Sequence, residues 1–129
     1  MGVGYAGQDE TVELRLSSDG NELAIVDLIG RRRRCDARLL AAGRADVAAA
    51  LARMAEAAER STFSDAPAKV LAEDGGRIDV AALPSGVAIY IFPPGSWKSR
   101  SVRLVPRDAR QLAAEMRHRG GTARRPARP

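Results

Sequence analysis

The first clear pattern in the chain is an alternation of apolar and polar residues that predicts a β-hairpin. From Thr11 to Ser17, valine and leucine alternate with charged residues, as in a strand with one buried face. Ser-Asp-Gly-Asn at residues 18–21 tolerates the backbone angles of a tight reversal. The apolar pattern resumes from Glu22 to Ile29. We therefore predict two antiparallel strands joined by this turn.

An alanine-rich segment from Asp36 to Arg60 predicts a helix. Its larger apolar residues recur at helical spacing and define one apolar face; they are Leu40, Val47, Leu51, Met54 and Ala58. Gly43 leaves two starting points open, one near Asp36 and one near Asp46.

The second half returns to strand patterns. Four short segments are predicted as strands: Ala68–Glu73, Arg77–Leu83, Val87–Phe92 and Ser101–Val105. They are separated by Asp-Gly-Gly, Pro-Ser-Gly and Pro-Pro-Gly, which are typical turn sequences. The third segment carries no charge. It is therefore either a central strand covered on both sides or a strand with one face at a subunit contact.

A second helix is predicted to begin at Pro106, because proline suits the first helical position. Asp108 follows where the helix dipole favours a negative charge. The apolar residues then keep helical spacing until Gly120 and Gly121, which are expected to end the helix.

The predicted order is β-β-α-β-β-β-β-α. It indicates an α+β fold in which two helices pack on one face of a small antiparallel sheet. We expect a flexible N-terminus at residues 1–10, a single domain at 11–118 and a disordered, arginine-rich tail at 119–129. The pattern leaves open whether the strands form one sheet or two.

The closing segment, Val102–Pro106 followed by Asp108–Leu112, resembles the last strand and helix of the Whirly-like families that bind single-stranded DNA. A β-meander precedes that helix in those families. The helix predicted between Asp36 and Arg60 has no counterpart in such a four-stranded unit. Val105 also replaces the hydroxyl or aspartate side chain expected as a helix cap. We therefore transfer no function from this resemblance.

The excess of positive charge lies at the C-terminal end. The 129 residues include 21 basic and 16 acidic ones, a net charge of +5, which favours an acidic partner such as nucleic acid. Five arginines lie between Arg117 and Pro129, where no acid occurs, so the rest of the chain is balanced. The tail is either a weak electrostatic binding segment or a solubilising end.

Catalytic and metal-binding chemistry has little support. A single cysteine, Cys35, excludes an intramolecular disulfide and a thiol-rich metal site. Residues 2–7 spell G-x-G-x-x-G, but no strand precedes them, whereas the dinucleotide fingerprint lies between a strand and a helix. We find no metal motif, phosphate-binding loop or nucleophile elbow. We therefore expect no enzymatic activity, cofactor or metal.

The apolar runs are too short for a membrane protein. No apolar signal region follows Met1, and the longest bulky apolar run is far below the roughly 20 residues that span a bilayer. We expect a soluble, cytoplasmic protein without a membrane partner.

Two segments carry candidate binding chemistry. Gly95–Ser101 contains the only tryptophan, Trp97, with Lys98 and Arg100 beside it. Aromatic rings stack on bases while cations hold phosphates, although such a loop can also anchor a protein or fold back over the core. The other segment consists of Arg31, Arg32, Arg33 and Arg34. It is either a patch that contacts phosphates or a solvated connection between two elements.

These features support two hypotheses for a small, non-enzymatic binding domain. In the first, it binds nucleic acid through Trp97, Lys98, Arg100 and the Arg31–Arg34 segment, helped by the tail. In the second, it is an accessory or regulatory protein that acts by protein–protein contact, and a homodimer through Val87–Phe92 is one form that this contact could take. Steep salt dependence is expected only for the first.

Overall fold

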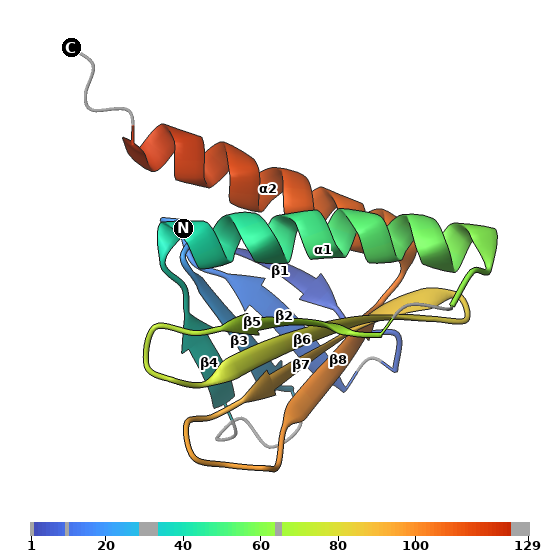
Figure 1. The fold of residues 1–129 in the computed structure, drawn as a ribbon, viewed down its shortest axis with the longest axis horizontal. Coiled ribbons are helices and arrows are strands. Elements are labelled where there is room, and N and C mark those ends of the chain that lie inside the picture. Colours follow the sequence, from blue (N-terminus) through green and yellow to red (C-terminus); the bar gives the residue numbers. More distant parts are fainter. Residues whose placement is uncertain (1, 10, 29–33, 64–65, 125–129) are drawn as a thin grey trace.

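The computed structural model describes residues 2–9, 11–28, 34–63 and 66–124. It contains two four-stranded sheets and two helices (Figure 1). The elements are β1 (Val3–Ala6), β2 (Val12–Leu16), β3 (Glu22–Asp27), β4 (Arg34–Arg38), α1 (Ala41–Arg60), β5 (Ala68–Leu71), β6 (Arg77–Leu83), β7 (Gly86–Phe92), β8 (Arg100–Leu104) and α2 (Pro106–Arg124).

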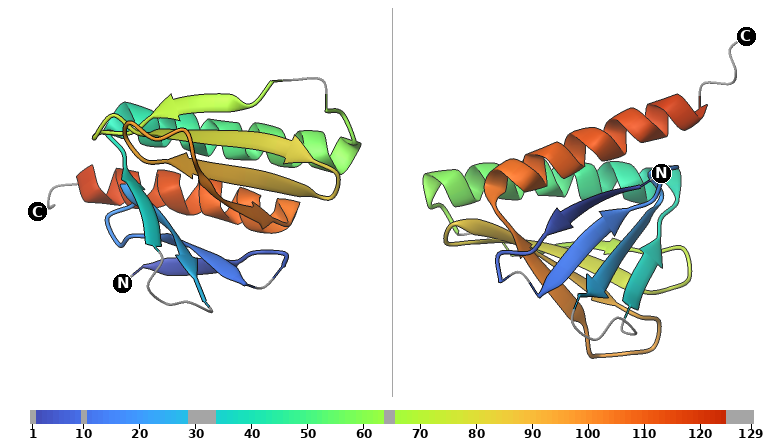
Figure 2. Two further views of the ribbon diagram at one scale, coloured as in Figure 1. Left: turned by 90° about the horizontal axis from the view of Figure 1, so that it is seen from below. Right: turned by 180° about the vertical axis from the view of Figure 1, so that it is seen from behind.

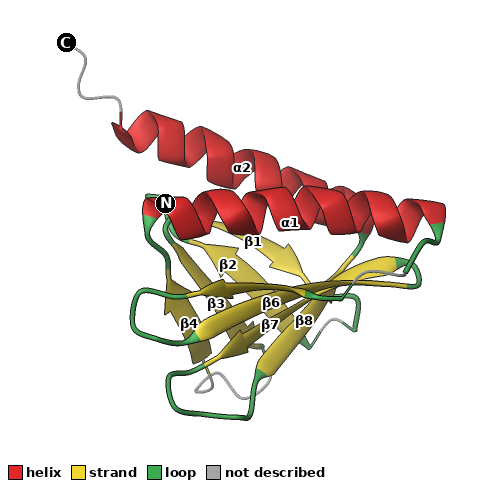
Figure 3. Cartoon of the chain, in the orientation of Figure 1, coloured by secondary structure: helices red, strands yellow, loops and turns green. Residues whose placement is uncertain are grey.

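Both sheets are antiparallel meanders, and each is followed by one helix. Sheet A has the order β1-β2-β3-β4, and sheet B has the order β5-β6-β7-β8. The two helices pack along each other, and both sheets lie on the same side of this helix pair (Figure 3). The predicted α+β class and the order of the predicted elements are confirmed, and the open question of sheet number is answered by two sheets.

Two strands were not expected from the sequence. Val3–Ala6, within the segment expected to be flexible, forms β1 and pairs with β2. Arg34–Arg38 forms β4, which pairs with β3, so α1 begins only at Ala41. The second helix runs through the two glycines that were expected to end it and reaches Arg124. Of the predicted tail, residues 125–129 lie outside the described residues.

One apolar core joins both sheets and both helices. Leu14 and Ile25 in sheet A and Ile78 and Ile89 in sheet B are fully buried and belong to the same cluster. The helices contribute Leu51, Met54, Leu112 and Met116, which are equally buried. Alternate strand residues point to opposite faces, so each sheet turns one face toward this core and leaves the other, outer face away from it.

Direct contacts between the sheets hold them as one body. Asp27 in β3 and Arg100 in β8 form an ion pair of 3.5 Å. The Cys35 thiol in β4 donates to the carbonyl oxygen of Ile91 in β7 at 3.6 Å. Figure 2 shows the molecule from below and from behind, and in both views the two helices lie together on one side of the two sheets.

Candidate binding face on sheet B

The register of sheet B defines an outer face that carries aromatic and charged side chains. In β7, Val87, Ile89 and Ile91 are buried against the core, so the alternate residues turn outward. The outer face of sheet B includes Lys69, Leu71, Arg77, Asp79, Ala81, Leu83, Ala88, Tyr90, Phe92, Ser101 and Arg103. Two aromatic rings of β7 are thus placed among cations from β5, β6 and β8.

Arg77 fixes the Phe92 ring on this face. The guanidinium carbon of Arg77 lies 4.3 Å from the centre of the ring, in a cation–π contact. The Nε atom of Arg77 donates to Asp79 Oδ1 at 2.8 Å, and Asp79 is buried. The charge of Arg77 is therefore neutralised locally, and its side chain acts mainly as a clamp on Phe92.

A hydrogen-bonded turn presents Trp97 to solvent. The Ser96 amide donates to the Pro93 carbonyl at 3.1 Å, and Gly95 takes a left-handed φ of 73°. The Lys98 amide donates to Ser96 Oγ at 3.1 Å. Trp97 is 82% exposed, with Lys98 Nζ 5.2 Å from its ring. The indole therefore does not fold back over the core.

Trp97 and Phe92 line one shallow cavity at the end of the outer face. This cavity has a volume of about 530 Å³. Arg77 and Leu71 line it from β6 and β5, and Gly75 and Gly76 line it from the turn between those strands. We call it the Trp97 pocket. It brings the loop predicted from the sequence next to the aromatic residue at the end of β7.

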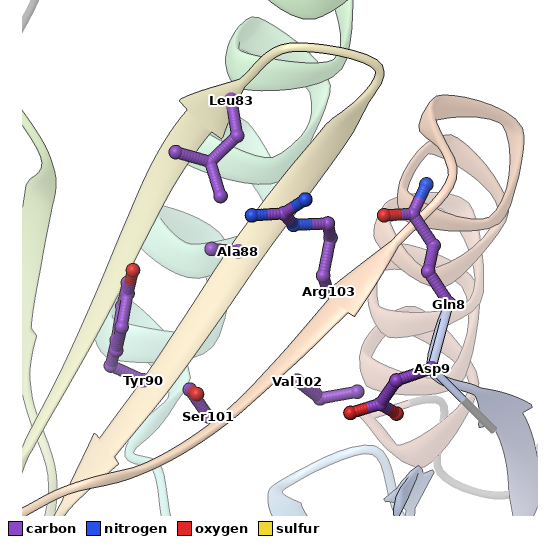
Figure 4. Close-up of a pocket in the computed structure, with 8 residues that line it drawn as sticks. All are labelled: Gln8, Asp9, Leu83, Ala88, Tyr90, Ser101, Val102 and Arg103. Atoms are coloured by element: carbon purple, nitrogen blue, oxygen red, sulfur yellow. The ribbon is translucent and has the colours of Figure 1, made fainter. Parts of the chain in front are cut away.

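A second cavity of about 400 Å³ lies at the β8 edge of the same face. Tyr90, Ser101 and Arg103 line it from sheet B, and Gln8 and Asp9 line it from the loop that follows β1 (Figure 4). We call it the Arg103 pocket. The side chain of Arg103 makes no ion pair with any carboxylate in the described part of the chain.

Close backbone approach places Gln8 and Asp9 at the rim of this pocket. A Cβ on Gly7 would lie 2.9 Å from Val102 Cγ2 and 3.2 Å from the Val12 carbonyl oxygen, so a larger residue would force a shift where the loop meets β8. The Gln8 amide donates to the Arg103 carbonyl at 2.8 Å, and Gln8 Nε2 donates to the Ser85 carbonyl at 2.9 Å. The first half of the chain thus supplies part of a pocket built on the second half.

The structure brings together only some of the residues predicted to bind. Trp97 and Lys98 lie together beside the outer face of sheet B. Arg100 points to the inner side of β8, where it is 31% exposed and paired with Asp27. Arg34 is the first residue of β4. Arg31, Arg32 and Arg33 lie outside the described residues.

Sequence reasoning missed Tyr90, Phe92, Arg77 and Arg103. The uncharged run of β7 was interpreted as a strand covered on both sides or one with a face at a subunit contact, and neither interpretation pointed to its two aromatic rings as a ligand surface. A signal was present in the neighbouring strands, because Arg77, Asp79, Ser101 and Arg103 alternate with apolar residues there. Only the register shows that these polar positions share a face with Tyr90 and Phe92.

Other chemistry is less developed in the structure. Burial raises the pKa of the Cys35 thiol, which opposes formation of a reactive thiolate. Among the described residues, no three histidine, cysteine or acidic side chains gather as metal ligands would. Within the described ranges, no helix is long and apolar enough to cross a membrane.

No protein-family model, curated protein or solved structure matches the chain.

Proposed function

We propose that this protein is a binding module for single-stranded nucleic acid and that the outer face of sheet B, with Trp97 and Lys98, is its binding surface. The observation that carries the proposal is that Tyr90 and Phe92 share an outer face that also bears cations, and that Trp97 lines a pocket with Phe92 at the end of this face. Single-strand binders combine aromatic platforms with a positively charged path for the backbone.

The spacing of the rings suits a single strand. Tyr90 and Phe92 are two residues apart on β7 and therefore about 6.6 Å apart along the strand. Trp97 continues the series past the end of β7. The rings of Tyr90 and Trp97 can stack on unpaired bases, and such stacking tolerates any sequence. At Phe92 the Arg77 guanidinium lies over the ring, and a guanidinium plane can also stack on a base. Bases inside a duplex are already stacked, so we expect duplexes to bind more weakly.

The cations of this face are available for phosphates. Lys69, Lys98 and Arg103 form no ion pair with the acids that the structure describes. Each phosphate that they neutralise releases counterions, which gives binding a strong dependence on salt. The arginines after Met116 would add attraction without needing a defined geometry.

Fluorescence anisotropy with labelled oligouridine of about ten nucleotides, titrated over a range of salt concentrations, tests the proposal. We expect binding at low salt that weakens steeply as salt rises. Phe92→Ala and Trp97→Ala should each reduce affinity about 5- to 150-fold, the range of one lost stacking contact. A duplex of the same length serves as the comparison ligand.

Phe63→Ala is the matched control, because Phe63 is an exposed aromatic residue between α1 and β5 that lines neither pocket. It should leave affinity unchanged. Replacing Arg124, Arg125 and Arg128 by glutamine should weaken binding without removing the effect of Phe92→Ala. Binding that depends only on these arginines would contradict a site on sheet B.

A protein partner is the second candidate, and one observation favours it. Leu71 and Trp97, which are 74% and 82% exposed, line the same pocket and form an apolar spot that suits a protein contact. Since β7 is central in sheet B, a second copy of the chain would have to dock on the outer face rather than pair with this strand. Absence of nucleic-acid binding at low salt, with a complex that survives moderate salt, would favour this candidate.

A further inference from the structure

An acidic side chain interrupts the cationic surface at its β8 edge. Asp9 lines the Arg103 pocket together with Tyr90 and Ser101. A carboxylate beside a polyanion is unfavourable unless it accepts a hydrogen bond from the ligand. Single-stranded nucleic acids offer two kinds of donor, the N–H groups of bases and the 2′-hydroxyl of ribose.

The carboxylate of Asp9 is held in a defined orientation. Its Oδ1 atom accepts a hydrogen bond from the Thr11 amide at 3.1 Å. The neighbouring Gln8 is fixed to β8 and to Ser85 through its backbone and side chain. The described residues give Oδ2 no hydrogen-bond partner. One oxygen of Asp9 is thus bonded to the backbone of its own loop, and the other is left to accept a hydrogen bond from a ligand.

The order of side chains across the pocket distinguishes the two donors. Tyr90 in β7 and Ser101 in β8 are direct cross-strand neighbours. Figure 4 shows Asp9 on the other side of β8 from Tyr90, with Ser101 and Val102 between them. A base stacked on Tyr90 with its sugar directed toward β8 would place the 2′-hydroxyl, rather than the base edge, beside Asp9.

On the basis of the proposed function, we propose that Asp9 and Ser101 form a ribose subsite that favours RNA over DNA. The carboxylate accepts a hydrogen bond from the 2′-hydroxyl of the nucleotide stacked on Tyr90. Arg103 faces the same pocket and interacts with an adjoining phosphate. Because the contact is made to the ribose hydroxyl, its strength does not depend on which base the nucleotide carries.

Four matched single strands of about ten nucleotides test the subsite by anisotropy at one salt concentration. They are oligouridine, oligodeoxyuridine, and the 2′-fluoro and 2′-O-methyl forms of oligouridine. Only the first can donate from the 2′ position, whereas the 2′-fluoro form keeps a sugar shape similar to that of RNA. We expect oligouridine to bind about five- to tenfold more tightly than the other three, the effect of one hydrogen bond.

The protein variants used are Asp9→Ala and Ser101→Ala in the full chain. Asp9→Ala should reduce the ratio of oligouridine to oligodeoxyuridine affinity to about one, because only oligouridine loses a hydrogen bond, while the affinity for oligodeoxyuridine does not fall, since a negative charge is removed. Asp46→Ala is the charge-matched control, since Asp46 is exposed on α1 in the helix layer. It should leave the ratio unchanged. Amide spectra of Asp9→Ala show whether the fold is retained.

The results separate this inference from the proposed function. If no strand binds at low salt, the proposed function fails. If all four strands bind equally and Phe92→Ala still weakens them, the ribose subsite alone is refuted. Equal binding of the 2′-fluoro and natural RNA strands would also refute it, since sugar shape would then explain the preference. A preference among bases that disappears in Asp9→Ala would assign the carboxylate to a base instead.

Discussion

The outer faces of the two sheets differ although their inner faces are alike. Both sheets bury a continuous apolar inner face in one core. On the outside of sheet A, Arg15 pairs with Glu13 at 2.8 Å, and Arg38 pairs with Asp19 at 3.1 Å. Sheet B carries Tyr90 and Phe92 on its outer face, where Arg77 pairs with Asp79 at 2.8 Å. Lys69 and Arg103 on the same face form no ion pair with the acids that the structure describes.

This difference separates the requirements of folding from those of binding. Folding requires an apolar inner face in both halves. It makes no such demand on the outer face, which on sheet A is solvated and carries paired charges. Tyr90 and Phe92 are partly buried, and the Arg77 guanidinium covers the Phe92 ring. Trp97 is 82% exposed, so its side chain gains little from burial. The exposed indole beside sheet B is therefore not explained by folding alone.

The largest expected effect concerns the shared core. Leu14→Ala in sheet A and Ile89→Ala in sheet B should each lower the free energy of unfolding by about 2–5 kcal/mol, because each removes a fully buried side chain. Urea unfolding followed by both fluorescence and circular dichroism measures this. Because both halves share one core, the transition should stay single in each variant. Separate unfolding of the two halves would contradict the shared core.

The next effect should appear in binding without appearing in stability. Trp97→Ala should cost about 1–3 kcal/mol of binding free energy for single-stranded RNA. Its free energy of unfolding should change by less than about 0.5 kcal/mol, since Trp97 is exposed. A thermal melt and an anisotropy titration on the same preparation compare the two. A large loss of stability in Trp97→Ala would show that the indole has a structural role.

A smaller effect should distinguish the two halves at low pH. The hydroxyl of Ser17, the amide of Asn21 and the guanidinium of Arg38 lower the pKa of Asp19 in the β2–β3 turn to about 2. Because this pKa lies below its unfolded value, the stabilisation is present above pH 4 and is lost as pH falls through 2. Asp19 is partly exposed, so we expect about 1 kcal/mol.

Asp19→Asn should therefore reduce the acid-induced loss of stability between about pH 4 and pH 2. Urea unfolding at several pH values measures this for the wild type and the variant. The turn between β6 and β7 contains proline, serine and glycine but no acid. Equal pH dependence in both proteins would show that Asp19 does not stabilise the sheet A turn.

The smallest effect concerns single cations on the two faces. Arg103→Gln should lower the slope of log affinity against log salt by about 0.7, the value for one phosphate of a single strand. Arg15→Gln, on the outer face of sheet A, should leave the slope unchanged. Equal changes in both variants would indicate general charge attraction rather than a path over sheet B.

Local patterns predicted most of the fold. The alternation in β2 and the turn after it were sufficient for the first hairpin, and Pro106 marked the start of α2. β1 and β4 were missed because their signals are weak. β1 contains glycine, and the inward residues of β4 are only Cys35 and Ala37. Pairing with a neighbouring strand, rather than local propensity, makes these segments strands.

The candidate site was predicted only where its residues are consecutive in the sequence. Trp97 and Lys98 were recognisable because an aromatic residue and a cation stand together. Arg100 stands beside them in the sequence but faces inward, since alternate residues of β8 point to opposite sides. Asp9 and Arg103 lie far apart in the chain and share a pocket because the loop after β1 is bonded to β8 through Gln8, with Gly7 in close contact with Val102.

The most direct test of a binding face on sheet B is a two-dimensional ¹H–¹⁵N NMR titration with oligouridine. Trp97 is the only tryptophan, so its indole N–H gives a single assigned signal. We predict that this signal and the amides of Tyr90, Phe92 and Arg103 shift together, while those of Glu13 and Arg15 do not. Shifts confined to sheet A, with the Trp97 signal unchanged, would contradict the account.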